Sequence, residues 1–257
     1  MKKKIYRRSI ELTNGRFTSG LVSRFAKSSW SGRIIPNYIK TYKIDTTDIE
    51  LPVSSFGSLH DFFIRTLIAE SRPLANEPVV SPVDGRVEIA GDLHDNTRFL
   101  VKGHPYLLEE LLGNDELANR YRNGKYIVLY LSPADYHRIH SPADGSILKQ
   151  FTLGKKSYPV NQAGLTYGKS PISGNYRMIS EMDTDFGRML VVKVGAMFVN
   201  SIELSNFESS WEKGEEIAHF SFGSTVVLFF EEGKINFCEN VRAGERIKVG
   251  EALAYMV

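Results

Sequence analysis

Hydrophobic and polar residues follow two different periods along this chain, and the change of period divides it into two parts. Near the N-terminus the apolar residues recur about every 3.6 positions, which is the helical period, at Phe17, Leu21 and Phe25. Arg24 and Lys27 lie between them and face the other way. The pattern predicts a short, basic, amphipathic helix.

A second helix is predicted from Ser58 to Leu67. Ser58 has the side chain of an N-cap, and Asp61 occupies the third helical position, where a carboxylate meets the positive end of the helix dipole. Pro73 and Pro78 close this helical region. One more short helix is expected between Tyr106 and Leu112.

The rest of the chain is dominated by short runs of β-branched and aromatic residues bounded by Gly, Pro, Asp or Asn, which predict strands. These runs are Arg98–Lys102, Tyr126–Leu131, Ser146–Phe151, Met189–Val194 and Thr225–Phe230. The predicted fold class is therefore α+β, with helices near the N-terminus followed by a mostly antiparallel β body.

Two short elements occur twice, which suggests that the β body is a duplicated sandwich or half-barrel. Ser81–Val87 and Ser141–Ile147 share the pattern Ser-Pro-x-Asp-Gly, a tight turn that leads into a strand. A spaced-glycine pattern in Ala243–Leu253 is echoed at Lys213–Ile217. Both strings resemble the hairpins of biotinyl and lipoyl carrier domains, but neither holds the attachment lysine, so a carrier role is not expected.

Charge is distributed unevenly along the 257 residues, although 32 basic and 30 acidic residues leave a net charge of only +2. That total argues against a dedicated nucleic-acid binder. Residues 1–43 contain 11 lysines and arginines and one acid, a net charge of +10, and the remainder carries −8. A basic leader on an acidic body indicates an anionic surface as partner. The leader is either an interfacial membrane anchor or a helix docked on its own body.

Sorting signals and disulfides are not evident in the sequence. Cys238 is the single cysteine, so no intrachain disulfide can form. No run of 18 apolar residues could span a membrane. The leader lacks the apolar core of a secretory signal, although transit peptides are also basic and poor in acids.

Three segments combine reactive side chains with unusual backbone: Asp84 in its turn, Asp135–Pro142 with His137 and His140, and Phe222–Thr225 with Gly223 and Ser224. Each is also compatible with a purely structural turn. The two histidines could ligate zinc, but the chain has neither His-Glu-x-x-His nor a cysteine pair. An aspartate, a histidine and a serine could instead form an acid, base and nucleophile relay.

These segments together closely resemble the phosphatidylserine decarboxylase family, in its compact bacterial type. The resemblance rests on Ser-Pro-Val-Asp84-Gly, Asp-Tyr-His137-Arg-Ile-His140-Ser-Pro, Val194-Gly195-Ala196-Met197 and Phe-Gly223-Ser224-Thr. It is extended by Asp61–Arg65, Val101–His104 with Tyr106–Leu112, Val160-Asn161 and Lys213–Phe220. It covers about residue 56 to the C-terminus. The serine motif has Phe where Leu is common, and residues 162–175 find no match.

The resemblance implies a proenzyme that cuts its own chain. Ser224 would attack the carbonyl group of Gly223, with His140 as general base and Asp84 orienting His140. The products are a β chain of residues 1–223 and an α chain of residues 224–257, whose first residue, Ser224, becomes a pyruvoyl group. This built-in cofactor decarboxylates phosphatidylserine to phosphatidylethanolamine. His140, or else His137, returns the proton.

The same resemblance implies a pocket bordered by Gly195, Ala196 and Met197, and no metal. We expect residues 1–50 to form a membrane-associating leader and residues 51–257 one catalytic domain. The partners are phosphatidylserine in an anionic membrane, the cleaved chains themselves and a homodimer of them. The expected location is peripheral, on the cytoplasmic face of the cell membrane. The alternatives are a hydrolase that uses Ser224 or a His137/His140 zinc site, and a β-sandwich binding protein that is never processed.

Overall fold

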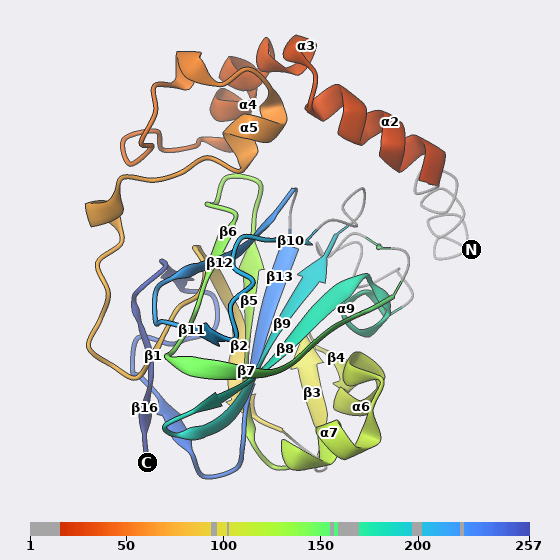
Figure 1. The fold of residues 1–257 in the computed structure, drawn as a ribbon, viewed down its shortest axis with the longest axis vertical. Coiled ribbons are helices and arrows are strands. Elements are labelled where there is room, and N and C mark those ends of the chain that lie inside the picture. The colour runs from red at the N-terminus through yellow and green to blue at the C-terminus, as the bar shows by residue number, and fades with distance from the viewer. Residues whose placement is uncertain are drawn as a thin grey trace.

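A computed structural model of the chain describes residues 16–93, 97–101, 103–154, 157–158, 170–196, 202–221 and 224–257. Helices come first along the chain: α2 (Arg16–Ala26), α3 (Ser29–Gly32), α4 (Ile35–Tyr42) and α5 (Leu59–Phe63), with two 3₁₀ turns, η1 (Val53–Ser55) and η2 (Ala69–Ser71). The β body follows, and the helices lie above one end of it (Figure 1). The predicted α+β order, helices first and antiparallel strands after, is confirmed.

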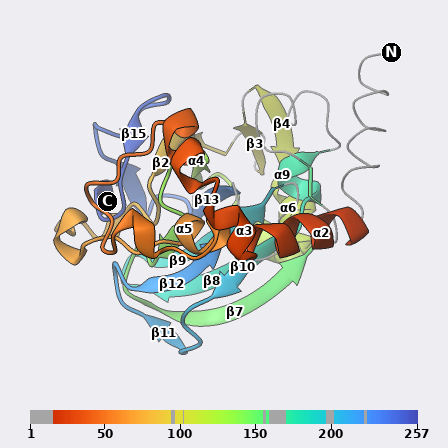
Figure 2. The ribbon, with the colours of Figure 1, turned by 90° about the horizontal axis from the view of Figure 1, so that it is seen from above.

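The helical layer consists of α2 to α5 and the segments that join them, and specific contacts between its own residues hold it together. Ser58 caps α5 as predicted, because its side chain accepts a hydrogen bond from the Asp61 amide at 3.1 Å. The predicted continuation to Leu67 is wrong, since Leu67 leaves the helix and pairs with Ile49 in an isolated antiparallel bridge. Seen from above, α2 to α5 extend across the end of the β body (Figure 2).

The β body is built on one antiparallel sheet of eight strands in the order β11-β7-β8-β9-β13-β5-β2-β15. Its strands are β11 (Ser210–Trp211), β7 (Gly145–Leu153), β8 (Arg177–Thr184), β9 (Gly187–Gly195), β13 (Ser224–Phe230), β5 (Lys125–Leu131), β2 (Gly85–Asp92) and β15 (Arg246–Ile247). β13 lies near the centre, and every one of its residues is buried. Because β13 is buried on both faces of the sheet, its run Val-Val-Leu-Phe-Phe is apolar without alternation.

Three smaller units complete the β body. One sheet has the order β1-β16-β14, another β10-β12-β6, and β3 pairs with β4. Their strands are β1 (Val79–Val80), β16 (Ala252–Met256), β14 (Ile235–Phe237), β10 (Ile202–Leu204), β12 (Glu216–Phe220), β6 (Arg138–His140), β3 (Arg98–Val101) and β4 (His104–Leu107). Each predicted strand is confirmed to within two residues over the described part of the chain.

Both faces of the large sheet are covered. One face packs against the small sheets through residues such as Val226, Leu228 and Phe220. The other face packs, through Val227 and Phe229, against the β3–β4 hairpin and three short helices: α6 (Leu108–Leu112), α7 (Asp115–Arg120) and α9 (Pro171–Gly174). The helix predicted from Tyr106 begins only at Leu108, because Tyr106 pairs with Phe99 inside the hairpin.

The two Ser-Pro-x-Asp-Gly turns occupy equivalent places, which supports the predicted duplication. In each turn the serine hydroxyl donates to a carbonyl two residues on, from Ser81 to Val83 at 2.8 Å and from Ser141 to Ala143 at 2.7 Å. Each turn aspartate accepts a hydrogen bond from a glycine-loop amide, which Val249 donates to Asp84 at 2.9 Å and Lys213 donates to Asp144 at 2.8 Å.

The glycine that ends each turn is required by space. A Cβ atom on Gly85 would lie 2.7 Å from the carbonyl oxygen of Tyr130, and one on Gly145 would lie 2.6 Å from that of Asp183. Both contacts are closer than carbon and oxygen can approach without moving the backbone. The repeat therefore places β2 and β7 tightly against their neighbouring strands.

Candidate functional site

The predicted site segments meet at one edge of the large sheet, beneath the helical layer (Figure 1). Ser224, the first residue of β13, lies opposite Leu131, the last residue of β5, and opposite Gly195, the last residue of β9. Gly85 begins β2 on the other side of β5. The turn that carries Asp84 and the loops after β5 and β9 consequently reach the same edge. Gly223 and Met197, as well as residues 160–161 and 162–169 of the unmatched segment, lie outside the described residues.

Ser224 is held in a dry place. Its relative exposure is 0%, and none of the described residues forms a hydrogen bond with its Oγ. Along β13 its side chain shares a face with Val226 and Leu228, which belong to the core between the sheets. Gly195 opposite has no side chain that could cover the hydroxyl. A buried hydroxyl without a partner costs free energy, and such groups are candidates for chemistry.

His137 is also fully buried and has one free nitrogen. Its Nδ1 lies 2.7 Å from the carbonyl oxygen of Asp135, which can only accept, so Nδ1 carries the proton. Its Nε2 has no hydrogen-bond partner within the described part of the chain. The ring packs on Phe63 with 3.9 Å between centroids. Burial, and next the nearby Arg65 guanidinium, lower the pKa of His137 to about 3. At neutral pH its Nε2 therefore offers a lone pair.

His140 differs from His137 because both of its ring nitrogens are occupied. Nδ1 lies 2.8 Å from the carbonyl oxygen of Gly214, and Nε2 lies 3.1 Å from the hydroxyl oxygen of Tyr136. Burial lowers the pKa of His140, while the Gly214 hydrogen bond and the Glu216 carboxylate oppose that shift. His140 is therefore neutral at pH 7.

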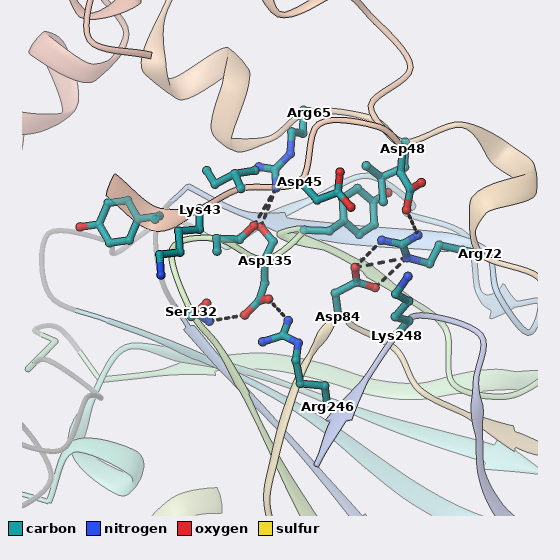
Figure 3. A pocket seen from close by; sticks show the side chains of 15 residues that line it. Lys43, Asp45, Asp48, Arg65, Arg72, Asp84, Ser132, Asp135, Arg246 and Lys248 are labelled. Carbon is teal, nitrogen blue, oxygen red and sulfur yellow. Dashed lines mark hydrogen bonds and ion pairs between the residues drawn. The ribbon is translucent and has the colours of Figure 1, made fainter. Parts of the chain in front are cut away.

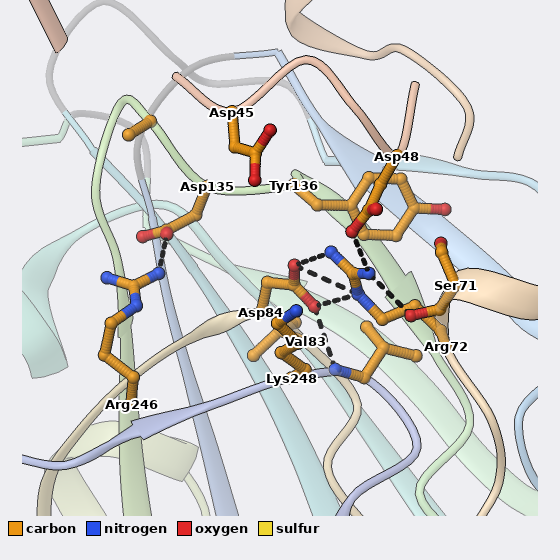
Figure 4. A network of polar contacts seen from close by, with 12 residues as sticks. Asp45, Asp48, Ser71, Arg72, Val83, Asp84, Asp135, Tyr136, Arg246 and Lys248 are labelled. Atoms are coloured by element: carbon orange, nitrogen blue, oxygen red, sulfur yellow. Dashed lines mark hydrogen bonds and ion pairs between the residues drawn. The ribbon is translucent and has the colours of Figure 1, made fainter. Parts of the chain in front are cut away.

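Asp84 forms an ion-pair network rather than a contact with His140 (Figure 4). Its carboxylate accepts hydrogen bonds from Arg72, with the shortest at 2.6 Å, and from the Val249 amide. Arg72 also binds Asp48 at 2.9 Å, which links the network to the helical layer. Burial by itself lowers the pKa of Arg72, but its bonds to Asp84 and Asp48 outweigh burial and raise it. Among the described contacts, Asp84 and His140 share no hydrogen bond through which Asp84 could orient the imidazole; the catalytic roles of both stay a prediction.

Two of the matching motifs are in direct contact, which explains why both carry charged residues. Arg65 donates to the carbonyl groups of Ala134 and Asp135 at 3.0 and 3.1 Å. In return, Arg138 donates to the carbonyl of Ile64 at 2.9 Å and forms an ion pair with a carboxylate of β12. The two residues that follow α5 thus hold the loop that presents His137.

A cavity of about 470 Å³ lies between the helical layer and this edge of the β body (Figure 3). Asp135 in its wall accepts hydrogen bonds from the Ser132 amide and from Arg246. The wall combines five cationic with four acidic side chains: Lys43, Arg65, Arg72, Arg246, Lys248, Asp45, Asp48, Asp84 and Asp135. Such a lining suits a polar, charged ligand better than a bare hydrocarbon chain.

Several of these residues were not singled out from the sequence. Arg72 and Asp48 stand in no recognisable motif, and only the fold brings them to the site. Gly214 stands in the spaced-glycine pattern Lys213–Ile217, which gave no sign of its contact with His140. Tyr136 and Asp135 stand inside the histidine segment, where their polar groups were the available signal. Among the described residues no three His, Cys, Asp or Glu side chains are placed to hold a metal ion. The zinc hydrolase alternative therefore finds no ligand set there.

Fold and site together define an α+β protein in which a helical layer covers a buried serine, two neutral histidines and an ion-pair network. A sequence model of the family described as phosphatidylserine decarboxylase matches residues 59–255. The phosphatidylserine decarboxylase proenzyme of Bacillus mycoides (strain KBAB4) is 48% identical over 259 residues, with 100% of this chain and 99% of the relative covered. Proenzymes of the same name from Bacillus thuringiensis subsp. konkukian (strain 97-27) and Bacillus cereus (strain AH187) are each 47% identical over 256 residues, with 99% and 98% covered.

The chain belongs to the phosphatidylserine decarboxylase family, whose members are carboxy-lyases. The family matched is the one that the sequence motifs indicated.

Proposed function

We propose that this chain is a proenzyme that cuts itself before Ser224 and then converts phosphatidylserine to phosphatidylethanolamine and carbon dioxide. The observation that carries the proposal is the position of Ser224. It is the first residue of the central strand β13, and its buried hydroxyl has no hydrogen-bond partner among the described residues. The relatives of this chain are named as proenzymes, which agrees with self-cleavage.

The cut and the formation of the pyruvoyl group need only groups of this chain and one water molecule. The Ser224 hydroxyl gives its proton to a histidine, and its oxygen attacks the Gly223 carbonyl carbon. The peptide C–N bond then breaks, which leaves an ester to Oγ and a free amine on Ser224. Loss of the α proton expels the Gly223 carboxylate, and hydrolysis of the resulting enamine releases ammonia. The new N-terminus is a pyruvoyl group. We assign His140 as the base, with His137 as the second candidate.

The surroundings of Ser224 suit a small carbonyl group at the start of β13. Leu131 on one side and Gly195 on the other leave the position dry and, toward Gly195, free of a side chain. Once formed, the pyruvoyl group supplies an electron sink for the electron pair left by departing carbon dioxide. Gly195 and Ala196 would border it, and a neutral histidine nearby can move the proton that replaces the carboxylate.

Mass spectrometry of the purified protein under denaturing conditions tests the cut. We expect a 34-residue fragment, residues 224–257, with a blocked N-terminus and the mass of a pyruvoyl group in place of serine. The Ser224→Ala variant should stay whole and inactive. Ser180→Ala is the matched control, because Ser180 is a buried serine on the same sheet and its loss should leave cutting intact. An uncut, serine-bearing wild-type chain that decarboxylates phosphatidylserine would contradict the proposal.

We also propose that α2 attaches the protein peripherally to anionic lipid on the cytoplasmic face of the membrane. Leu21 and Phe25 are each 51% exposed, so about half of the surface of these two apolar side chains is open to contact with lipid. Arg24 in the last turn of α2 and Lys27 directly after it add cationic groups that favour anionic head groups. No described helix is both long and apolar enough to cross a bilayer.

Sedimentation with lipid vesicles tests this attachment. The wild-type protein should pellet with vesicles that contain phosphatidylserine and be released by high salt. Leu21→Gln combined with Phe25→Gln should reduce binding at least about tenfold, since two large side chains lose about 1.5–3 kcal/mol each of burial in the interface. Leu148→Gln changes a similarly exposed leucine, 44% exposed on β7, and should not. Equal binding by all three proteins would contradict the role of α2.

A further inference from the structure

The imidazole of His140 has no free nitrogen. Nδ1 is hydrogen-bonded to the carbonyl oxygen of Gly214 at 2.8 Å, and Nε2 is hydrogen-bonded to the hydroxyl of Tyr136 at 3.1 Å. Neither Asp84 nor Ser224 forms a described hydrogen bond to this ring: the carboxylate of Asp84 is engaged by Arg72 and Val249, and the Ser224 hydroxyl has no partner. A proton that reaches His140 must therefore displace one of these two partners or pass through it.

The two partners are not equivalent, and their chemistry fixes the tautomer. The carbonyl oxygen of Gly214 can only accept, so Nδ1 carries the hydrogen and Nε2 the lone pair. Tyr136 then donates its hydroxyl hydrogen to Nε2. Burial raises the pKa of Tyr136 above its ordinary value, so the phenol keeps that hydrogen at neutral pH. Nε2 is the basic atom, and the Tyr136 hydroxyl is hydrogen-bonded to it.

We propose that Tyr136 is a positioning residue that relays the proton to His140 during self-cleavage. The inference rests on the proposed function, in which His140 is the base. As the serine hydroxyl attacks, the phenol hydrogen moves to Nε2 and the Tyr136 oxygen takes up the proton that the serine releases. The phenol ends the step unchanged. The imidazolium ring now donates Nε2–H to the Tyr136 oxygen, and this charge-assisted hydrogen bond is stronger than the one it replaces.

Burial lowers the pKa of His140 and so opposes the imidazolium that this transfer creates. The Gly214 hydrogen bond and the carboxylates of Glu216 and Asp84 offset part of that cost, whereas Arg138 adds to it. Tyr136 lines the cavity beside the Arg72–Asp84 ion pair (Figure 4). Asp84 therefore acts on His140 through the electric field of its carboxylate. This explains how the two residues can belong to one site without touching.

A double-mutant cycle on the rate of self-cleavage tests the relay. Full-length precursor is made by cell-free synthesis, synthesis is stopped, and the appearance of the 34-residue chain is followed on gels. We expect His140→Gln and Tyr136→Phe each to slow the cut about 100-fold or more, the size of a general-base contribution. Because the two residues act as a unit, the double variant should be no slower than His140→Gln alone.

Tyr126→Phe is the matched control. Tyr126 is a buried tyrosine of β5 whose hydroxyl accepts a hydrogen bond from the Leu100 amide at 3.0 Å, away from His140. It should lose stability without slowing the cut comparably. A purely structural role for Tyr136 predicts the opposite pattern, in which the rate effects of Tyr136→Phe and His140→Gln multiply.

A second readout does not depend on cutting. In the uncut Ser224→Ala protein, the NMR titration of the His140 Cε1 proton reports its pKa directly. Loss of the phenol removes the stronger bond to the charged form, so Tyr136→Phe should lower this pKa by about 0.7 units or more, from the difference in strength between charged and neutral hydrogen bonds.

The outcomes separate the two proposals. If Tyr136→Phe cuts at the wild-type rate, or leaves the titration unchanged, or multiplies with His140→Gln, the relay is overturned while His140 can still be the base. If His140→Gln cuts at the wild-type rate, the base assignment of the proposed function fails, and the relay fails with it.

Discussion

Lys193 lies in the middle of the β body with an exposure of 0%, and its replacement by methionine is expected to stabilise the protein at pH 7. Its Nζ donates to the Ser180 hydroxyl at 2.9 Å and lies 5.3 Å from the ring centre of Trp211. Among the described ion pairs, none joins it to a carboxylate. Burial without a counter-charge lowers its pKa from 10.5 to about 7.

The magnitude follows from that shift. A difference of about 3.5 pKa units corresponds to about 5 kcal/mol between charged and neutral forms. Between pH 7 and pH 10.5 the unfolded chain binds more protons than the folded one, so the free energy of unfolding rises with pH across this window. From pH 7 to pH 9 the contribution of Lys193 should rise by about 2 kcal/mol. Methionine has nearly the same volume and no charge, so its variant should lack this rise.

Urea denaturation of the uncut Ser224→Ala protein measures the effect, because a single chain then unfolds. Trp211 packs against Lys193 and reports the transition by fluorescence. Lys193→Met should be more stable than its parent at pH 7, by about 2–3 kcal/mol after the lost hydrogen bond and cation–π contact are subtracted, and the advantage should shrink by about 2 kcal/mol at pH 9. Lys125→Met, a surface change on β5, is the control. If the free energy of unfolding of Lys193→Met exceeded that of its parent by the same amount at pH 7 and pH 9, the reasoning would be refuted.

Three further predictions concern the site and the turns. Arg72→Met should destabilise the protein by about 3 kcal/mol, because it leaves the buried Asp84 carboxylate unpaired; a thermal scan with no drop would contradict this. Because the folded pKa of His137 is lowered to about 3, stability should fall as pH drops below about 6.5, by about 2 kcal/mol at pH 5, and His137→Gln should lose that dependence in acid titrations. Gly145→Ala should cost more than 1 kcal/mol, because its Cβ would meet a neighbouring carbonyl at 2.6 Å; Gly91→Ala, with nothing within 4 Å, should be near neutral in the same melt.

The order of elements could be predicted from local pattern because local physics decides it. A run such as Tyr126–Leu131 is apolar, β-branched and bounded by turn residues, so it forms a strand wherever it is placed. The Ser58 cap follows from one hydroxyl and one amide three residues apart. The ends of elements were less well predicted, because they depend on distant partners. Leu67 pairs with Ile49 instead of continuing helix α5, and Tyr106 pairs with Phe99 in a hairpin instead of beginning a helix.

The site was predicted as a list of residues but not as a set of contacts. The motifs shared with the phosphatidylserine decarboxylase family indicated Ser224 and His140 but not their partners. The expected pairing of Asp84 with His140 ignored Arg72, a residue outside the motifs whose two-pronged guanidinium outcompetes a neutral imidazole for a carboxylate. A hydrogen bond of Tyr136 to a ring four residues on could not be read from spacing, since it depends on how the loop after β5 folds.

The amino-acid sequence alone determines which reactive groups are present: a serine after a glycine, two histidines three residues apart and an aspartate in a repeated Pro-x-Asp-Gly turn. It also determines the uneven charge, which is concentrated in the first 43 residues. Such features depend on neighbours within a few positions, where covalent connection limits the geometry. Which nitrogen of His140 is basic, what neutralises Asp84 and how dry Ser224 is depend on groups far away in the chain. Those properties arise only when the antiparallel sheet brings the ends of β5, β9 and β13 together, because burial and hydrogen bonding are set by the neighbours that packing supplies.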